Sequence, residues 1–289
     1  MKRLLSFSGT TDNFKETAQL IRNTAGVHGF VFPLAVYKEW HGKNKDNLDD
    51  ILAFAHEKSY ILCARADYDF IRTAIEHTKL CAADCEFLSD LGIPQFHITV
   101  TQQAGSSSID MLEYDTLATG MRNVLKSILH TGPRISLVFR GNHVVDTPSG
   151  AGTFLKKLEP YSPQIAVDSG SLMEECRIDP EILFLYLQKH INAIIFPPEI
   201  SADAAFDPFS FLDFIRDHDY EEAIVLQSSI RYTAQEKEYC DRYINYLLDN
   251  SAEKISGKIF EREIAEKEAK IRAAKKAALE KNSKKLFPY

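Results

Sequence analysis

The sequence predicts a single (β/α)8 TIM barrel over residues 1–250, followed by a charged helical C-terminal extension over residues 251–289. Short apolar runs alternate with longer amphipathic segments through the first 250 residues, which is typical of βα units around a parallel sheet. The run Ala223–Leu226 is apolar at every position, as expected for a strand that is covered on both faces. A chain of 289 residues is long enough for one such domain.

Eight short apolar runs, most of them bounded by turn-forming or capping residues, are predicted as strands. The predicted strands are Arg3–Ser8, Gly29–Leu34, Tyr60–Ala64, Gln95–Thr101, Ile135–Arg140, Gln164–Asp168, Ile191–Phe196 and Glu222–Gln227.

A helix is predicted after each strand, and several of these helices have clear boundaries. Asp179-Pro180 and Asp207-Pro208 each combine an N-cap residue with proline in the first turn, and Gly92 with Pro94 ends a long helix. The predicted helices are Thr11–Thr24, Leu48–Glu57, Tyr68–Leu91, Ile109–His130 and Thr147–Leu158, two that begin at Asp179 and Asp207, and Thr233–Leu248.

A doubly wound open sheet is the alternative architecture. Such a sheet usually has a glycine-rich phosphate-binding turn after its first strand. The corresponding segment here, Ser8–Thr11, has one glycine and lacks that pattern. The sequence therefore favours the barrel.

Charge and composition limit the classes of partner. The net charge is −7, and because Glu253–Tyr289 holds 11 basic and 6 acidic side chains, the remaining 252 residues carry −12. An acidic barrel is not expected to bind nucleic acid. No apolar run is long enough to span a membrane and the N-terminus does not resemble a signal peptide, so we expect a cytoplasmic protein. The five scattered cysteines fit packed thiols in a reducing compartment.

The C-terminal extension is rich in alanine, glutamate and lysine. Ile264, Ile271 and Ala278 recur every seven residues, which indicates one apolar seam along a helix. We expect a solvated helix on the barrel flank; the alternatives are a partner helix that forms a homo-oligomer and a nucleic-acid-binding arm.

Three segments in the second half of the chain narrow the family. They are Ser136–His143 with Thr147-Pro148 after it, Ile165–Ser171, and Phe206–Leu212 followed by His218-Asp219-Tyr220. In order and spacing they resemble the strand segments of the xylose-isomerase-like barrels, which include sugar phosphate isomerases, epimerases, inositol-pathway enzymes and AP endonucleases. The resemblance extends to individual residues over Ser136–Gln227 and to the layout over Arg3–Asn250.

The resemblance implies a divalent metal held by a glutamate on strand five, an aspartate on strand six, a nearby histidine and a glutamate on strand eight. Here Asp168 is the strand-six aspartate, whereas Gln227 replaces the strand-eight glutamate. The strand-five position falls on Arg140 or Gly141. The histidine positions fall on Ser171 and near Ile195 and Phe196.

One carboxylate from that set is too little charge to hold a dication, and Gln227 cannot act as a base. We therefore expect no cofactor and no family-type metal centre. His97, His143 and Glu199 are the residues that could supply replacement ligands.

The candidate site residues lie at predicted strand ends, where barrels of this kind bind ligands. Asp168 and His143 are the candidate catalytic residues. Each has an alternative: Asp168 is a buried carboxylate paired with Arg140, and His143 is a loop residue. Trp40, placed in the loop after the second strand, either stacks on a sugar or packs structurally. The candidate substrate-binding residues are Arg65, Gln102, Arg140, Asn142 and Gln227.

Three functions remain open. The first is a barrel that binds a small polyol, sugar or sugar phosphate at the strand C-termini, with the metal site largely lost and isomerase or epimerase activity undecided. The second is a non-catalytic scaffold or assembly protein that uses the barrel and the C-terminal helix. The third is a metal-dependent isomerase with rearranged ligands.

Overall fold

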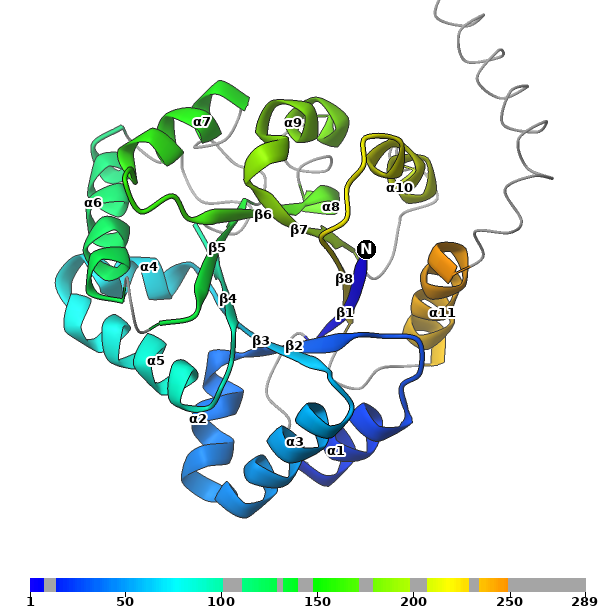
Figure 1. The fold of residues 1–289 in the computed structure, drawn as a ribbon. Coiled ribbons are helices and arrows are strands. Elements are labelled where there is room, and N and C mark those ends of the chain that lie inside the picture. Colours follow the sequence, from blue (N-terminus) through cyan, green and yellow to red (C-terminus); the bar gives the residue numbers. More distant parts are fainter. Residues whose placement is uncertain are drawn as a thin grey trace, which may run out of the picture. The chain divides into compact units, whose positions relative to one another are not determined.

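The computed structural model describes residues 1–7, 14–100, 111–128, 132–139, 148–171, 179–197, 207–228 and 234–248. Eight parallel strands form a closed barrel in chain order, each paired with the next and β8 paired with β1 (Figure 1). The predicted barrel is confirmed. The strands are β1 Lys2–Phe7, β2 Gly29–Pro33, β3 Ile61–Ala66, β4 Gln95–Thr99, β5 Arg134–Phe139, β6 Gln164–Asp168, β7 Ile191–Phe196 and β8 Ala223–Ser228.

Helices surround the strands on the outside of the barrel (Figure 1). The first compact unit of the chain, Met1–Asp241, contains the whole barrel; the second is Arg242–Tyr289. Of the described helices, none has the length and apolar character needed to cross a bilayer. The helices are α1 Phe14–Asn23, α2 Leu34–Lys43, α3 Lys45–Glu57, α4 Tyr68–Glu76, α5 Thr78–Asp90, α6 Met111–Ser127, α7 Pro148–Lys157, α8 Ser169–Ser171, α9 Pro180–Leu187, α10 Pro208–Asp217 and α11 Ala234–Leu248.

The two predicted Asp-Pro helix starts are confirmed by their caps. Asp179 Oδ1 accepts a hydrogen bond from the backbone N–H of Glu181 at 2.9 Å, and Asp207 Oδ1 accepts one from Phe209 at 3.0 Å. These carboxylates satisfy N–H groups that have no partner within the first helical turn.

Two helix predictions were wrong. The segment after β2 forms α2 as well as α3, so Trp40 lies in a helix, 1% exposed, rather than in a loop. The ring packs edge-on against Phe32 and Tyr37, which makes it part of the core. The predicted helix Tyr68–Leu91 is divided at His77, whose backbone (φ −129°, ψ 51°) leaves the helical region. An amphipathic pattern continues across such a break because both helices cover the same side of the sheet.

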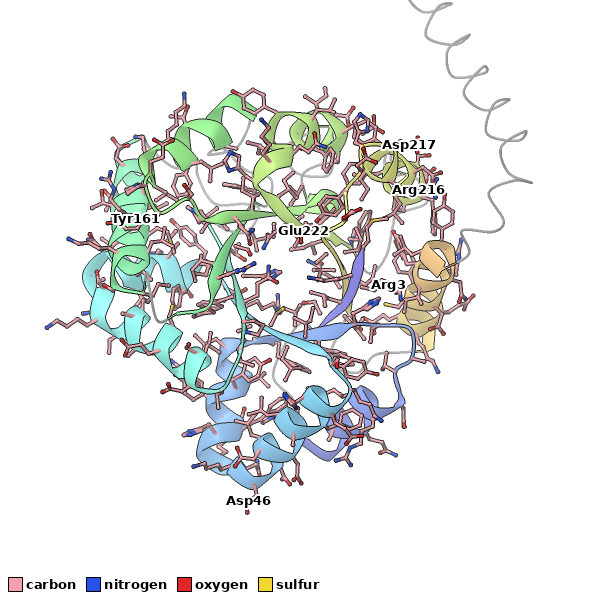
Figure 2. The ribbon with its side chains drawn as sticks, viewed as in Figure 1. Arg3, Asp46, Tyr161, Arg216, Asp217 and Glu222 are labelled. Atoms are coloured by element: carbon pink, nitrogen blue, oxygen red, sulfur yellow. The ribbon has the colours of Figure 1, made fainter. Side chains whose placement is uncertain are left out.

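Residues alternate between the inside and the outside of each strand. Outward aromatic side chains meet the helices, as Phe96 does with Phe70 and Phe196 with Phe211. Inward side chains form one apolar cluster, which consists of Leu4, Val31, Cys63, Val138, Ala166, Ala193, Ile195, Ala223 and Val225. Figure 2 shows side chains of the strands pointing into the middle of the barrel, and the burial of the cluster shows that this interior is a packed core.

A polar network closes the N-terminal end of this core. Ser136 Oγ accepts hydrogen bonds from Gln95 Nε2 at 3.1 Å and from Asn192 Nδ2 at 2.8 Å. Asn192 Nδ2 also donates to Gln164 Oε1 at 2.7 Å. These side chains satisfy one another inside the barrel, so this end has a structural role. The opposite, C-terminal end is the candidate for ligand binding.

Candidate functional site

Polar side chains gather at the C-terminal ends of four strands. Asp168 ends β6, Gln227 is the penultimate residue of β8, and Arg65 and Thr99 lie near the ends of β3 and β4. The alternation of the strands directs all four inward, since their neighbours at two-residue spacing belong to the interior. The barrel fold therefore brings together side chains that are up to 162 residues apart in sequence, from Arg65 to Gln227.

Asp168 and Gln227 meet directly. Gln227 Nε2 donates a hydrogen bond to Asp168 Oδ2 at 3.3 Å, across the intervening strand β7. Asp168 is 2% exposed and Gln227 is half-buried, so the pair lies in the mouth of the barrel with the amide on the more open side. The structure thus brings together two of the predicted site residues.

The strand between them supplies an apolar wall. Ile195 of β7 points inward and belongs to the core cluster. Ser169, directly after Asp168, donates from its hydroxyl to the Ile195 carbonyl at 2.9 Å, which ties the end of β6 to β7. A Cβ atom on Gly170 would lie 2.7 Å from Pro197 Cγ, so the glycine of the strand-six segment is needed for this close approach.

Arg65 and His97 form the second part of the site. They are register partners on β3 and β4, and His97 is 2% exposed while Arg65 is half-buried. Burial, and secondarily the positive charge of Arg65, lowers the pKa of His97 to about 4. The imidazole is therefore neutral at physiological pH, and the cation at this side of the mouth is Arg65.

The other predicted site residues cannot be placed beside these. Gln102, Arg140, Asn142 and His143 lie outside the described residues, as does Glu199. The predicted Asp168–Arg140 pair therefore stays a prediction. From the sequence, His97 is expected either to pack inside the strand with one hydrogen bond or to replace a metal ligand. The polar residues Gln95, His97 and Thr99 at two-residue spacing on one strand are a signal for a polar inward face.

The described residues do not fit the divalent-metal centre that the resemblance implies. Asp168 offers one carboxylate, and Gln227 is neutral and turns its N–H toward that carboxylate. Within the described ranges, no group of three or more His, Cys, Asp or Glu side chains is arranged to hold a metal ion. Because His143 and Glu199 are outside those ranges, the loss of the metal centre remains a prediction.

A cavity of about 320 Å³ lies at the other end of the barrel. It is lined by the end of α6, the start of β5 and the segment before β6, which includes Tyr161. Figure 2 labels Tyr161 at the outer ring of the molecule, away from the barrel interior. This cavity is therefore separate from the polar mouth.

Several solved structures have the same fold, and the match covers nearly the whole of each of those chains. D-psicose 3-epimerase from Clostridium cellulolyticum H10 is 12% identical, with a TM-score of 0.64 over 86% of this chain and 97% of its own. The probable 3-DHS dehydratase of petrobactin synthesis from Bacillus anthracis is 16% identical, with a TM-score of 0.68 over 86% and 100%. A xylose isomerase domain protein from Planctomyces limnophilus is 12% identical, with a TM-score of 0.59 over 89% and 98%.

These similarities confirm, at the level of the fold, the resemblance to xylose-isomerase-like barrels that the sequence predicts. No model of a protein family matches the chain, and no curated protein matches it in sequence. The neighbours are named for an epimerisation, a dehydration and an isomerase domain, so the shared fold supports more than one reaction.

Proposed function

We propose that this protein binds a small polyol, sugar or sugar phosphate at the C-terminal end of its barrel, without a family-type metal centre. The observation that carries the proposal is the hydrogen bond between Gln227 and Asp168 in the barrel mouth. A carboxylate accepts hydrogen bonds and an amide both donates and accepts, so the pair suits adjacent hydroxyl groups, each of which is a donor and an acceptor.

The positions of these residues support the proposal. Enzymes with this barrel bind their substrates at the C-terminal ends of the strands, and neighbours of this fold were solved with sugars, among them D-tagatose and D-fructose. Arg65 supplies a guanidinium at the same end, which suits a phosphate group.

Each residue of the barrel mouth has its own proposed contact with the ligand. Asp168 accepts a hydrogen bond from a ligand hydroxyl and, if the ligand is turned over, is the candidate base together with His143. Gln227 donates to the ligand and Arg65 binds its phosphate. Gln102, Arg140 and Asn142 follow β4 and β5 in the sequence, and we propose that they also bind the ligand.

Thermal unfolding with a defined panel tests the proposal. The sugar panel contains D-fructose, D-tagatose, D-allulose, myo-inositol, xylitol and D-ribulose 5-phosphate. A ligand at a hundred times its Kd adds about 2.7 kcal/mol of stability, which is a readily measured rise in Tm. We expect at least one member to stabilise the wild type, and Asp168→Asn and Gln227→Ala to remove the effect.

Matched controls separate site effects from general ones. Asp213→Asn removes a carboxylate that pairs with Arg216 at 2.8 Å on α10, and is expected to keep the response to ligand. Arg65→Ala is expected to weaken the binding of D-ribulose 5-phosphate more than the binding of the neutral sugars. A flat response of the wild type across the panel contradicts the proposal and favours the scaffold function. If the purified protein retains a metal, and a chelator removes the rise in Tm that a sugar causes, the metal-dependent isomerase is favoured.

The proposal extends to compartment and assembly. Cys63, Cys81 and Cys85 are buried thiols, and burial raises their pKa values to about 12, 11 and 12. Such thiols are unreactive and suit a protein of the reducing cytoplasm. Assembly through the C-terminal extension is retained as a proposal; deletion of residues 251–289 is expected to leave ligand binding intact and to lower the oligomeric state in light scattering.

A further inference from the structure

The inward face of β4 is polar along its whole length. Gln95 joins the N-terminal network, Thr99 lies at the mouth, and His97 lies between them. His97 is paired with Arg65 on β3 and with Ser136 on β5, and these residues are paired in turn with Pro33 on β2 and Gln164 on β6. The imidazole is therefore buried between a guanidinium on the mouth side and the serine of the N-terminal network.

His97 has an unsatisfied nitrogen. Its Nε2 atom is buried and has no hydrogen-bond partner among the described residues. Leaving a buried polar atom unpaired costs roughly 1–3 kcal/mol, and native proteins rarely accept this cost without a purpose. Ser136, the register partner of His97, accepts from Gln95 and Asn192 and makes no hydrogen bond to this nitrogen.

We propose that His97 Nε2 makes the deepest hydrogen bond to the ligand of the mouth, and that this bond is to an uncharged hydroxyl group. The inference rests on the proposed function and deepens it by stating how the ligand is oriented. Arg65, the register partner of His97, is half-buried and has a long, flexible side chain. A ligand phosphate that draws the guanidinium outward gives the hydroxyl end of the ligand access to His97.

The charges around His97 determine which end of a ligand enters first. The imidazole is held neutral by burial and by Arg65, so it has one N–H and one acceptor nitrogen and complements a hydroxyl. A cationic group is repelled by Arg65. A phosphate is better satisfied at Arg65, which has five N–H donors, than at a neutral imidazole. The neutral polyol end is therefore directed inward and the anionic end remains at the mouth.

A chemical double-mutant cycle tests this inference. Affinities of the sugar that binds best in the panel, and of its single-deoxy analogues, are measured by calorimetry with the wild type and with His97→Leu. We expect His97→Leu to weaken the parent sugar about fivefold to tenfold, the value of one net hydrogen bond. One deoxy analogue is expected to lose affinity in the wild type but not in His97→Leu, which identifies the hydroxyl that His97 contacts.

Two further variants and a spectroscopic signal separate binding from packing. His97→Gln keeps a neutral donor and acceptor and is expected to recover part of the affinity. Asn192→Leu is the matched control, since Asn192 Oδ1 is likewise buried without a partner in the described part of the chain, but at the opposite end of the barrel. It is expected to bind within twofold of wild type. In ¹⁵N-histidine spectra, the Nε2 resonance assigned through His97→Gln is expected to move when the sugar is added.

The outcomes are distinguishable. Equal affinity of wild type and His97→Leu, with an unmoved Nε2 resonance, overturns the inference and assigns an internal water as the partner. Equal weakening by His97→Leu and Asn192→Leu also overturns it, because the effect is then one of packing. If no panel sugar stabilises the wild type, the proposed function fails first, and the inference falls with it.

Discussion

Gln227 Nε2 donates a hydrogen bond to Asp168 Oδ2 at 3.3 Å, so an amide and a carboxylate face each other across β7 in the mouth of the barrel. The amide gives the carboxylate a donor without adding charge. A second carboxylate at the same place would need a cation or a proton to be stable. The amide of Gln227 therefore adds no negative charge that could help to hold a dication.

Gln227→Glu tests that relationship. Two carboxylates this close raise the pKa of one of them, and a group whose pKa is raised on folding loses stability as pH rises above its unfolded pKa. We expect the variant to be about 1–3 kcal/mol less stable than wild type at pH 7, and to recover as the pH falls toward about 5. Urea unfolding across this pH range is the measurement.

The same variant is expected to respond to Mn²⁺, because a dication relieves the repulsion between the carboxylates. Gln227→Leu is the control, since it removes the amide without adding charge and is expected to show neither the pH dependence nor the response to Mn²⁺. Identical pH profiles for Gln227→Glu and wild type would mean that the two side chains do not meet in solution.

Because of His97, we expect the free energy of unfolding of the wild type to fall at acid pH; this decrease is called the acid limb. Its pKa is lowered to about 4 in the folded protein, from the ordinary value of 6.5, chiefly by burial. The folded state therefore binds fewer protons than the unfolded chain below pH 6.5, and stability is lost as pH falls through this window by up to about 3 kcal/mol. Urea unfolding at pH 7, 6 and 5 measures the slope.

His97→Gln is expected to flatten this limb, because glutamine does not titrate. His56→Gln, at an exposed position on α3, is expected to leave it unchanged. An acid limb of the same steepness in His97→Gln would assign the effect to other groups.

Ser136→Ala tests the N-terminal network. The substitution removes the acceptor of half-buried Gln95 and buried Asn192, and leaves each side-chain amide with fewer partners. We expect a loss of roughly 1–3 kcal/mol in the free energy of unfolding, with no change in sugar affinity. Ser127→Ala, which removes an exposed hydroxyl that donates to Asn123 on α6, is expected to cost less than about 0.5 kcal/mol. A loss of sugar binding in Ser136→Ala would link this end of the barrel to the site.

Gly29→Ala tests the closeness of β2 and β3. A Cβ atom at this position would lie 1.9 Å from the backbone oxygen of Ile61, its register partner, and backbone cannot move aside as a side chain can. We expect a loss of about 3 kcal/mol or more, or a failure to fold. Gly42→Ala on α2 is the control, because nothing lies within 4 Å of its added Cβ, and it is expected to raise stability by roughly 0.5–1 kcal/mol.

Local pattern was sufficient for most of the architecture. All eight strands were predicted within a few residues, because a strand buried on both faces leaves a short apolar run between turn-forming residues. Asp179-Pro180 and Asp207-Pro208 placed two helix starts, since capping is decided by neighbouring residues. The same local logic missed α2 and the break at His77, where packing against neighbouring helices decides the backbone.

The sequence by itself determined the barrel and its strand order, because periodicity and capping are local properties. It also placed Asp168, Gln227 and Arg65 near the ends of predicted strands. Only the tertiary structure decided that Gln227 bonds Asp168 and that His97 lies neutral and buried beside Arg65. Those relationships join strands that are distant in the chain, and closure of the barrel sets the distances between them.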